Sequence, residues 1–121
     1  MIIGKSFKFD AAHHLPSYPG KCQRLHGHTW SITVEVEGEV NDSTCMVMDL
    51  NLLSEGVRGV LDEVDHTCLN DHLAFERCEP TCEMLAEWLK AELEGIFSQA
   101  LEKGAKVTVQ VQEGEGGWAR C

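Results

Sequence analysis

The chain has 121 residues, a formal net charge of −10 and six cysteines. This length indicates a single domain, residues 1–121, with a modest hydrophobic core that oligomerisation would help to stabilise. The acidic balance argues against nucleic acid or an anionic membrane as a partner, because both reward clustered Lys and Arg. No apolar run is long enough to span a bilayer, and the first residues lack the pattern of a signal peptide, so we expect a cytoplasmic protein.

Thiols stay reduced in the cytoplasm, so an even number of cysteines does not by itself predict a disulfide framework. The chain has no CxxC pair, which argues against a structural zinc site built from cysteines. We therefore expect free thiols at five positions: Cys45, Cys68, Cys78, Cys82 and Cys121.

Two strands are predicted at the start of the chain, over residues 3–12 and 29–37. In the second, apolar side chains such as Trp30 and Ile32 alternate with polar ones such as Thr33. This alternation is expected for an antiparallel sheet with one face in water.

The period then changes to that of a helix. From Leu50 to Val64 the apolar residues recur at helical spacing, and Asp49 is placed to cap the helix start. Gly56 and Gly59 weaken this helix by roughly 1 kcal/mol each relative to alanine. We expect these glycines to allow a close approach to the sheet.

A second helix is expected over residues 82–101, with Thr81 as its cap. Residues 106–113 predict a third strand, in which Glu113 closes an apolar row, and residues 118–121 a short fourth strand that pairs back. The order β-β-α-α-β-β indicates an α+β domain, with two helices on one face of a four-stranded antiparallel sheet.

Three histidines share the apolar side of the first two strands. Side chains alternate along a strand, so His13 ends the apolar face of the first, and His26 and His28 share the parity of the apolar residues in the second. Three imidazoles leave a metal with an open position, as in catalytic zinc sites. The alternative is that His13 and His28 are hydrogen-bonded core residues while His26 and His14 are solvated. Three imidazoles at matched parity favour the metal.

Cys22 lies between two cations, Lys21 and Arg24, and close in sequence to the histidines. This electropositive setting raises the thiolate fraction and suits a general base. Two alternatives are an incidental exposed cysteine and a fourth metal ligand, which would close the site.

The runs Ala11–His13 and Leu25–His28, together with Cys22, resemble the 6-pyruvoyl-tetrahydropterin and 6-carboxy-tetrahydropterin synthase family. Three residues lie between Cys22 and His26. This spacing resembles the 6-carboxy branch, which serves queuosine biosynthesis, whereas the pyruvoyl branch typically has a longer insertion.

The resemblance implies the tunnelling fold, whose sheets join around a central barrel in trimers that stack into hexamers. It implies Zn²⁺ held by the three histidines, with Cys22 as the base. It also implies a proton relay through His66, oriented by Asp65, although this adjacent pair alone indicates no more than solvated loop residues. Glu113 matches the position that accepts hydrogen bonds from the pterin ring, and its place on an apolar face requires some partner.

Other positions are also implicated in substrate binding. Thr81 and Glu83 match a family motif near the pterin, although helix capping explains both nearly as well. His14 stands where relatives often have a different residue, and it is a potential competitor for the metal. The triphosphate needs a basic patch, for which the nearby candidates are Lys5, Lys8, Lys21 and Arg24.

The implied activity is a zinc-dependent carbon–carbon lyase. It would convert 7,8-dihydroneopterin triphosphate into 6-carboxy-5,6,7,8-tetrahydropterin, releasing acetaldehyde and triphosphate. The alternatives are the pyruvoyl-forming reaction on the same substrate and a non-catalytic module that binds zinc or pterin. A zinc hydrolase is disfavoured because no glutamate stands beside the histidines as general base.

Overall fold

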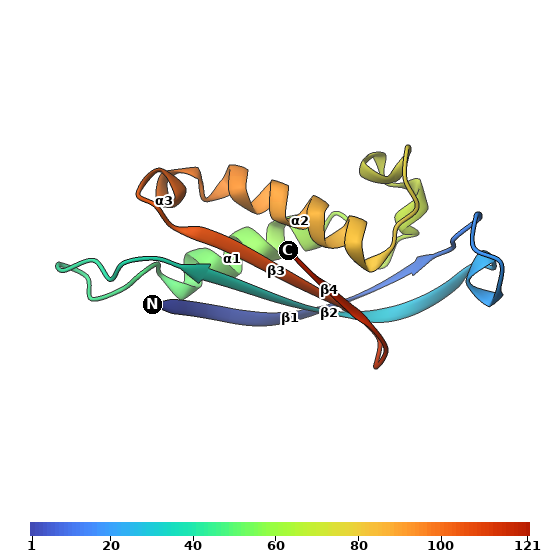
Figure 1. Cartoon of the computed structure of the whole chain (residues 1–121), viewed down its shortest axis with the longest axis horizontal. Helices are drawn as coiled ribbons and strands as arrows, with labels where there is room; N and C mark the ends of the chain where they lie inside the picture. Colours follow the sequence, from blue (N-terminus) through green and yellow to red (C-terminus); the bar gives the residue numbers. More distant parts are fainter.

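The computed structural model describes residues 1–121 and has helices along one face of a four-stranded antiparallel sheet (Figure 1). The strands lie in the order β1-β2-β3-β4, with bounds β1 Ile2–His13, β2 His26–Glu37, β3 Lys106–Glu113 and β4 Trp118–Arg120. The helices are α1 Leu50–Leu61, α2 Cys82–Ile96 and the short α3 Ser98–Glu102. The predicted α+β class and the β-β-α-α-β-β order are confirmed.

The first two strands are longer than predicted, because they pair along their whole length. The register runs from Ile2 opposite Glu37 to His13 opposite His26. The ladder therefore continues through the histidines, which the sequence pattern had placed beyond the strand ends. As a result, His13 and His26 lie directly opposite one another on neighbouring strands.

The core lies between the apolar face of the sheet and the helices. Trp30 and Ile32 on β2 are fully buried there, as are Leu53 of α1 and Leu89 of α2. This single layer of side chains supports the same face of the sheet on which the histidines emerge. None of the helices has the length and apolar character needed to cross a bilayer, and all six cysteines are free thiols.

Both long helices begin where capping residues predict. The Asp49 side chain accepts a hydrogen bond from the Asn51 N–H, and the Thr81 hydroxyl accepts one from the Met84 N–H at 3.4 Å. The prediction of one continuous helix over residues 82–101 is wrong, because the chain leaves the helical conformation at Phe97. Phe97 itself belongs to the core, where 7% of the residue is exposed.

The ring of Phe97 also explains one of the two glycines in α1. A Cβ atom added at Gly56 would lie 2.6 Å from Phe97 Cζ, whereas one added at Gly59 would meet no atom within 4 Å. The prediction that both glycines allow approach to the sheet is therefore wrong. Gly56 makes room for the end of α2, and nothing approaches Gly59.

We expect Gly56→Ala to lower the free energy of unfolding by about 1–3 kcal/mol, because the added methyl group overpacks the contact with Phe97. Gly59→Ala is the matched control in the same helix, and it should stabilise the protein by up to about 1 kcal/mol through helix propensity. Denaturant unfolding of both variants measures the difference. Equal effects of the two substitutions would contradict the assigned role of Gly56.

Candidate metal centre

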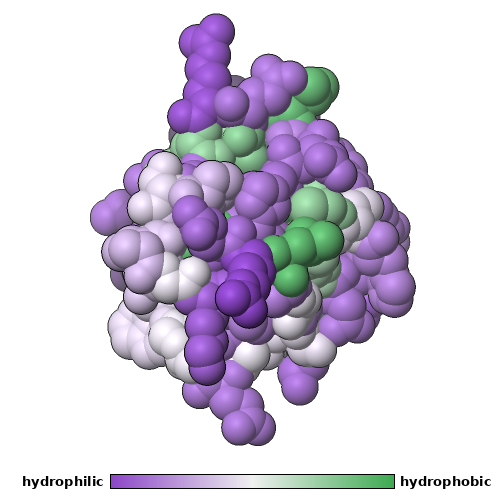
Figure 2. Space-filling model, turned by 90° about the vertical axis from the view of Figure 1, so that its right-hand side faces the viewer, coloured by the Kyte–Doolittle hydropathy of each residue, from purple (hydrophilic) through white to green (hydrophobic).

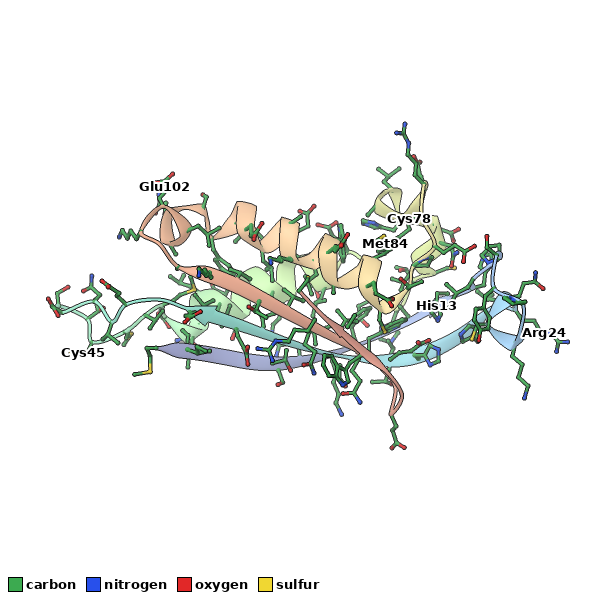
Figure 3. The ribbon with its side chains drawn as sticks, in the orientation of Figure 1. His13, Arg24, Cys45, Cys78, Met84 and Glu102 are labelled. Atoms are coloured by element: carbon green, nitrogen blue, oxygen red, sulfur yellow. The ribbon has the colours of Figure 1, made fainter.

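Three imidazoles meet at the end of the sheet where β1 ends and β2 begins. The ring centroids of His13 and His26 are 4.6 Å apart, those of His13 and His28 5.2 Å, and those of His26 and His28 4.8 Å. Figure 3 shows His13 at the same end of the molecule as Arg24 and far from Cys45. The strand pleat thus brings together the three histidines that the sequence placed on one face.

Backbone carbonyl groups orient two of these rings. His13 Nδ1 lies 2.8 Å from the carbonyl oxygen of Pro80, and His26 Nδ1 lies 2.6 Å from that of Arg24. A carbonyl oxygen only accepts hydrogen bonds, so each Nδ1 carries the hydrogen and donates it. In the neutral rings each Nε2 then offers its lone pair. A ring N–H on a backbone carbonyl is typical of metal-binding histidines, and in His26 the opposite nitrogen is also free. Sequence reasoning missed both carbonyls, since a backbone acceptor leaves no mark in the residue type.

Glu113 completes the cluster from β3. Its Oε1 lies 3.0 Å from His13 Nε2 and 2.6 Å from His28 Nε2, although the His28 contact lacks hydrogen-bond geometry. Glu113 reaches this position because it pairs in register with Trp30, two residues after His28. Its parity on β3 indicated a buried partner, but the sequence did not identify the imidazoles as that partner.

The cluster fits a cation. The Nε2 atoms of His26 and His28 are buried and have no hydrogen-bond partner. Burial is the main effect on His28 and lowers its pKa, although the negative charge of Glu113 acts in the opposite direction. The lowered pKa favours a neutral ring with an available lone pair. The imidazole lone pairs and the carboxylate oxygen repel one another unless a proton or a metal ion lies between them.

The donor atoms also suit a transition metal. One ligand atom from each of His13, His26, His28 and Glu113 lies within 4.8 Å of the others. Imidazole and carboxylate together are donors that zinc and its neighbouring divalent metals accept. The residues present therefore fit a metal ion, and they can offer it three nitrogens and one oxygen.

Cys22 lies in the loop that returns the chain from β1 to β2. It is half-buried on a 3-10 helix, Lys21–Gln23, and its carbonyl accepts a hydrogen bond from the Leu15 N–H at 2.7 Å. That bond holds the loop against a residue two positions after His13. Lys21 and Arg24 are exposed in the same loop. Viewed from this end of the molecule, most of the surface is hydrophilic, with small apolar patches (Figure 2).

Asp65 and His66 form a second cluster, with Asp10 and separate from the imidazoles. The Asp65 carboxylate lies 2.9 Å from His66 Nδ1 and accepts a hydrogen bond from the Asp10 N–H at 2.9 Å. The Asp10 bond is the main cause that holds the pKa of Asp65 below its usual value, so the carboxylate stays ionised and can orient the ring. His66 is 77% exposed and has a φ of 59°, which is uncommon for a residue with a side chain.

The remaining predicted site residues lie around these clusters in other roles. Thr81 caps α2, and Glu83 is exposed in its first turn, so capping accounts for both. Lys5 donates a hydrogen bond to the Ser54 hydroxyl of α1 at 2.5 Å, which commits it to the helix and not to a phosphate. The His14 side chain is not among the candidate ligands.

Cys82 stands near Glu113 but is not among the candidate metal ligands. Burial, and secondarily the negative charge of Glu113, raise the pKa of its thiol to about 11. The thiol is therefore protonated at neutral pH unless a bound metal ion displaces its proton.

A helix-covered antiparallel sheet that gathers three imidazoles and a carboxylate at one end defines an α+β protein with a candidate metal centre. The model of the family described as 6-pyruvoyl tetrahydropterin synthase matches residues 2–121. The chain belongs to this family.

Relatives and a solved structure agree with the family assignment. The chain is 42% identical over 98 residues to a 6-carboxy-5,6,7,8-tetrahydropterin synthase of Synechocystis sp., covering 77% of this chain and 74% of that protein. It is 39% identical over 85 residues to a dihydroneopterin monophosphate aldolase of Pyrococcus furiosus, covering 70% and 68%. The structure of 6-pyruvoyl tetrahydropterin synthase from Caenorhabditis elegans superposes with a TM-score of 0.86 at 26% identity, covering 100% of this chain and 94% of that one.

Proposed function

We propose that this protein is a zinc-dependent carbon–carbon lyase that forms 6-carboxy-5,6,7,8-tetrahydropterin from 7,8-dihydroneopterin triphosphate, releasing acetaldehyde and triphosphate. The observation that supports it most is the cluster of three imidazoles, two of which have buried Nε2 atoms without a hydrogen-bond partner, in a chain of the pterin synthase family. The proposal includes queuosine biosynthesis as the pathway, the cytoplasm as location, and a homotrimer or hexamer as the assembly.

The proposed roles follow the family resemblance, and the clustering of the histidines supports them. His13, His26 and His28 would hold the zinc ion. When bound, zinc supplies a Lewis acid that lowers the pKa of a substrate hydroxyl group. Cys22 accepts a proton from the substrate side chain.

The other proposed roles concern the proton relay and the pterin ring. His66, oriented by its contact with Asp65 at 2.9 Å, passes the proton on. Glu113 accepts hydrogen bonds from the pterin ring, which fixes the ring relative to the histidines. Arg24, exposed in the loop beside Cys22, is a candidate contact for the triphosphate.

The choice of the carboxy-forming reaction rests on the short spacing between Cys22 and His26 and on the Synechocystis relative. The names of the relatives also include an aldolase of a monophosphate and a pyruvoyl-forming enzyme. These reactions differ in the small products that leave the pterin, so product analysis separates them.

The test is to incubate the zinc-loaded protein with 7,8-dihydroneopterin triphosphate and identify the products. We expect 6-carboxy-tetrahydropterin, acetaldehyde and triphosphate in equal amounts. Triphosphate release without acetaldehyde would identify the pyruvoyl-forming reaction. Turnover of the monophosphate alone would support the aldolase, and pterin binding without turnover would support a binding module.

Glu113→Gln tests whether Glu113 binds the pterin. The substitution keeps the shape of the side chain but turns one acceptor into a donor that faces a donor of the ring. Since a hydrogen bond to a charged group contributes about 1.5–3 kcal/mol, we expect pterin affinity to fall by about 10- to 150-fold. Titration of the zinc-loaded wild-type and variant proteins with a pterin product measures this change.

The zinc content of the same samples tests the rival role of Glu113. Three imidazoles are sufficient to hold the metal, so we expect Glu113→Gln to stay loaded. Loss of zinc would instead mark Glu113 as a fourth ligand, consistent with its position 3.0 Å from His13 Nε2. Unchanged pterin affinity would remove Glu113 from the ring-binding site.

A further inference from the structure

The free edge of β1 is covered, near the metal centre, by the segment that follows α1. The Asp10 N–H donates to Asp65 Oδ1 at 2.9 Å, and the Asp10 carbonyl accepts from the His66 N–H at 2.6 Å. Two residues further along, the Ala12 N–H donates to the Thr67 carbonyl at 2.9 Å. Alternate residues of β1 thus bond outward to a chain segment that runs parallel to it.

Asn70 makes the last contact in this series, and it does so with its side-chain amide instead of its backbone N–H and carbonyl groups. Its Oδ1 accepts a hydrogen bond from the His14 N–H, and its Nδ2 donates one to the His14 carbonyl, both at 2.9 Å. One amide side chain therefore satisfies both backbone groups of His14, as a neighbouring strand would do. Alanine at this position would leave both of these partly buried groups without a partner.

His14 is the residue whose placement joins the parts of the proposed site. Its N–H belongs to the peptide bond that it shares with His13, whose ring is 99% buried with Nδ1 fixed on the Pro80 carbonyl. The next residue, Leu15, is the one that bonds to the Cys22 carbonyl. β1 ends its pairing with β2 at His13, so the ladder no longer holds His14. Asn70 therefore supplies the fixation that the sheet does not.

We propose that Asn70 is a positioning residue for the metal centre. By clamping both backbone groups of His14, it fixes the direction of the chain at His13 and thereby the approach of His13 Nε2 to the metal. Because Asn70 belongs to the same segment as Asp65 and His66, it also ties the metal ligand to the candidate relay pair. This inference rests on the metal site of the proposed function and not on the identity of the substrate.

The test compares zinc affinity between wild-type protein and Asn70→Ala, with the metal removed and then titrated back against a chelator. Loss of a group that orients a metal ligand typically costs 10- to 100-fold in affinity, and we expect a weakening of about that size. The visible spectrum of the Co²⁺-loaded protein is the second measurement. We expect Asn70→Ala to alter the intensity and position of its bands, because the geometry of the His13 ligand changes.

Asn41→Ala is the matched control. The Asn41 side chain also organises backbone, accepting hydrogen bonds from the Ser43 and Thr44 N–H groups, but in the loop between β2 and α1. We expect it to lower the melting temperature without changing zinc affinity or the Co²⁺ spectrum. An equal loss of affinity in Asn41→Ala would overturn the proposal, because general destabilisation would then explain both results.

Asn70→Asp keeps the test decisive if Asn70→Ala does not fold. It retains the acceptor for the His14 N–H but replaces the donor with a carboxylate oxygen that repels the His14 carbonyl, so we expect zinc binding to weaken in this variant as well. Wild-type affinity and spectrum in the folded variants would make Asn70 a purely structural residue. Zinc-loaded wild-type protein that makes no acetaldehyde would defeat the proposed reaction and leave the role of Asn70 standing.

Discussion

Cys22→Ala is expected to lower the turnover number by about 10²- to 10⁴-fold, the usual effect of removing a general base. The zinc content should not change, because Cys22 is not among the four residues that approach one another as candidate ligands. The hydrogen bond from the Leu15 N–H to the Cys22 carbonyl joins two backbone groups, so the loop keeps it without the thiol. Acetaldehyde release, measured together with zinc per chain, gives both quantities from one preparation.

Cys45→Ala is the control for this experiment, since Cys45 is an exposed free thiol at the other end of the molecule (Figure 3). It should turn over substrate at the wild-type rate. Zinc loss in Cys22→Ala would identify Cys22 as a fourth ligand, and the base would then have to be another group. An unchanged turnover number would also exclude Cys22 as the base.

Local patterns predicted most of the fold, because alternation and capping are properties of neighbouring residues. The class, the order of elements and the bounds of β3 follow directly from the sequence. The end of α2 does not, since the 3.6-residue pattern of apolar side chains is the same whether or not the helix breaks at Phe97. At the break the Phe97 ring lies close to Gly56, a contact between two helices that only the folded chain defines.

The same limit applies to the site. Side-chain parity brought His13, His26 and His28 to one face, because the period of a strand is fixed. It could not show that Glu113 reaches the imidazoles, since that depends on the register between β2 and β3, whose partners are far apart in sequence. Nor could it show the carbonyls of Pro80 and Arg24, or the backbone groups of Asp10 that hold the Asp65–His66 pair, because every residue carries such groups.

His13→Ala and His14→Ala together give the most direct test of the metal ligands, because adjacent residues point to opposite sides of a strand. We expect His13→Ala to weaken zinc binding by more than about 100-fold, beyond the loss typical of an orienting group, since a ligand is removed. His26→Ala and His28→Ala should behave alike. His14→Ala should keep the metal, because Asn70 bonds only to the backbone of His14.

The measurement is zinc per chain and the dissociation constant from chelator competition, together with the melting temperature of each metal-free protein. The melting temperature matters for His13, which is buried and bonded to Pro80, so that part of its loss is structural. His26 is half-exposed and pairs across the sheet with His13, and its substitution removes a candidate ligand with less damage to packing. If His26→Ala bound zinc like the wild type while His14→Ala did not, the metal would lie on the other side of β1 and the proposed centre would be wrong.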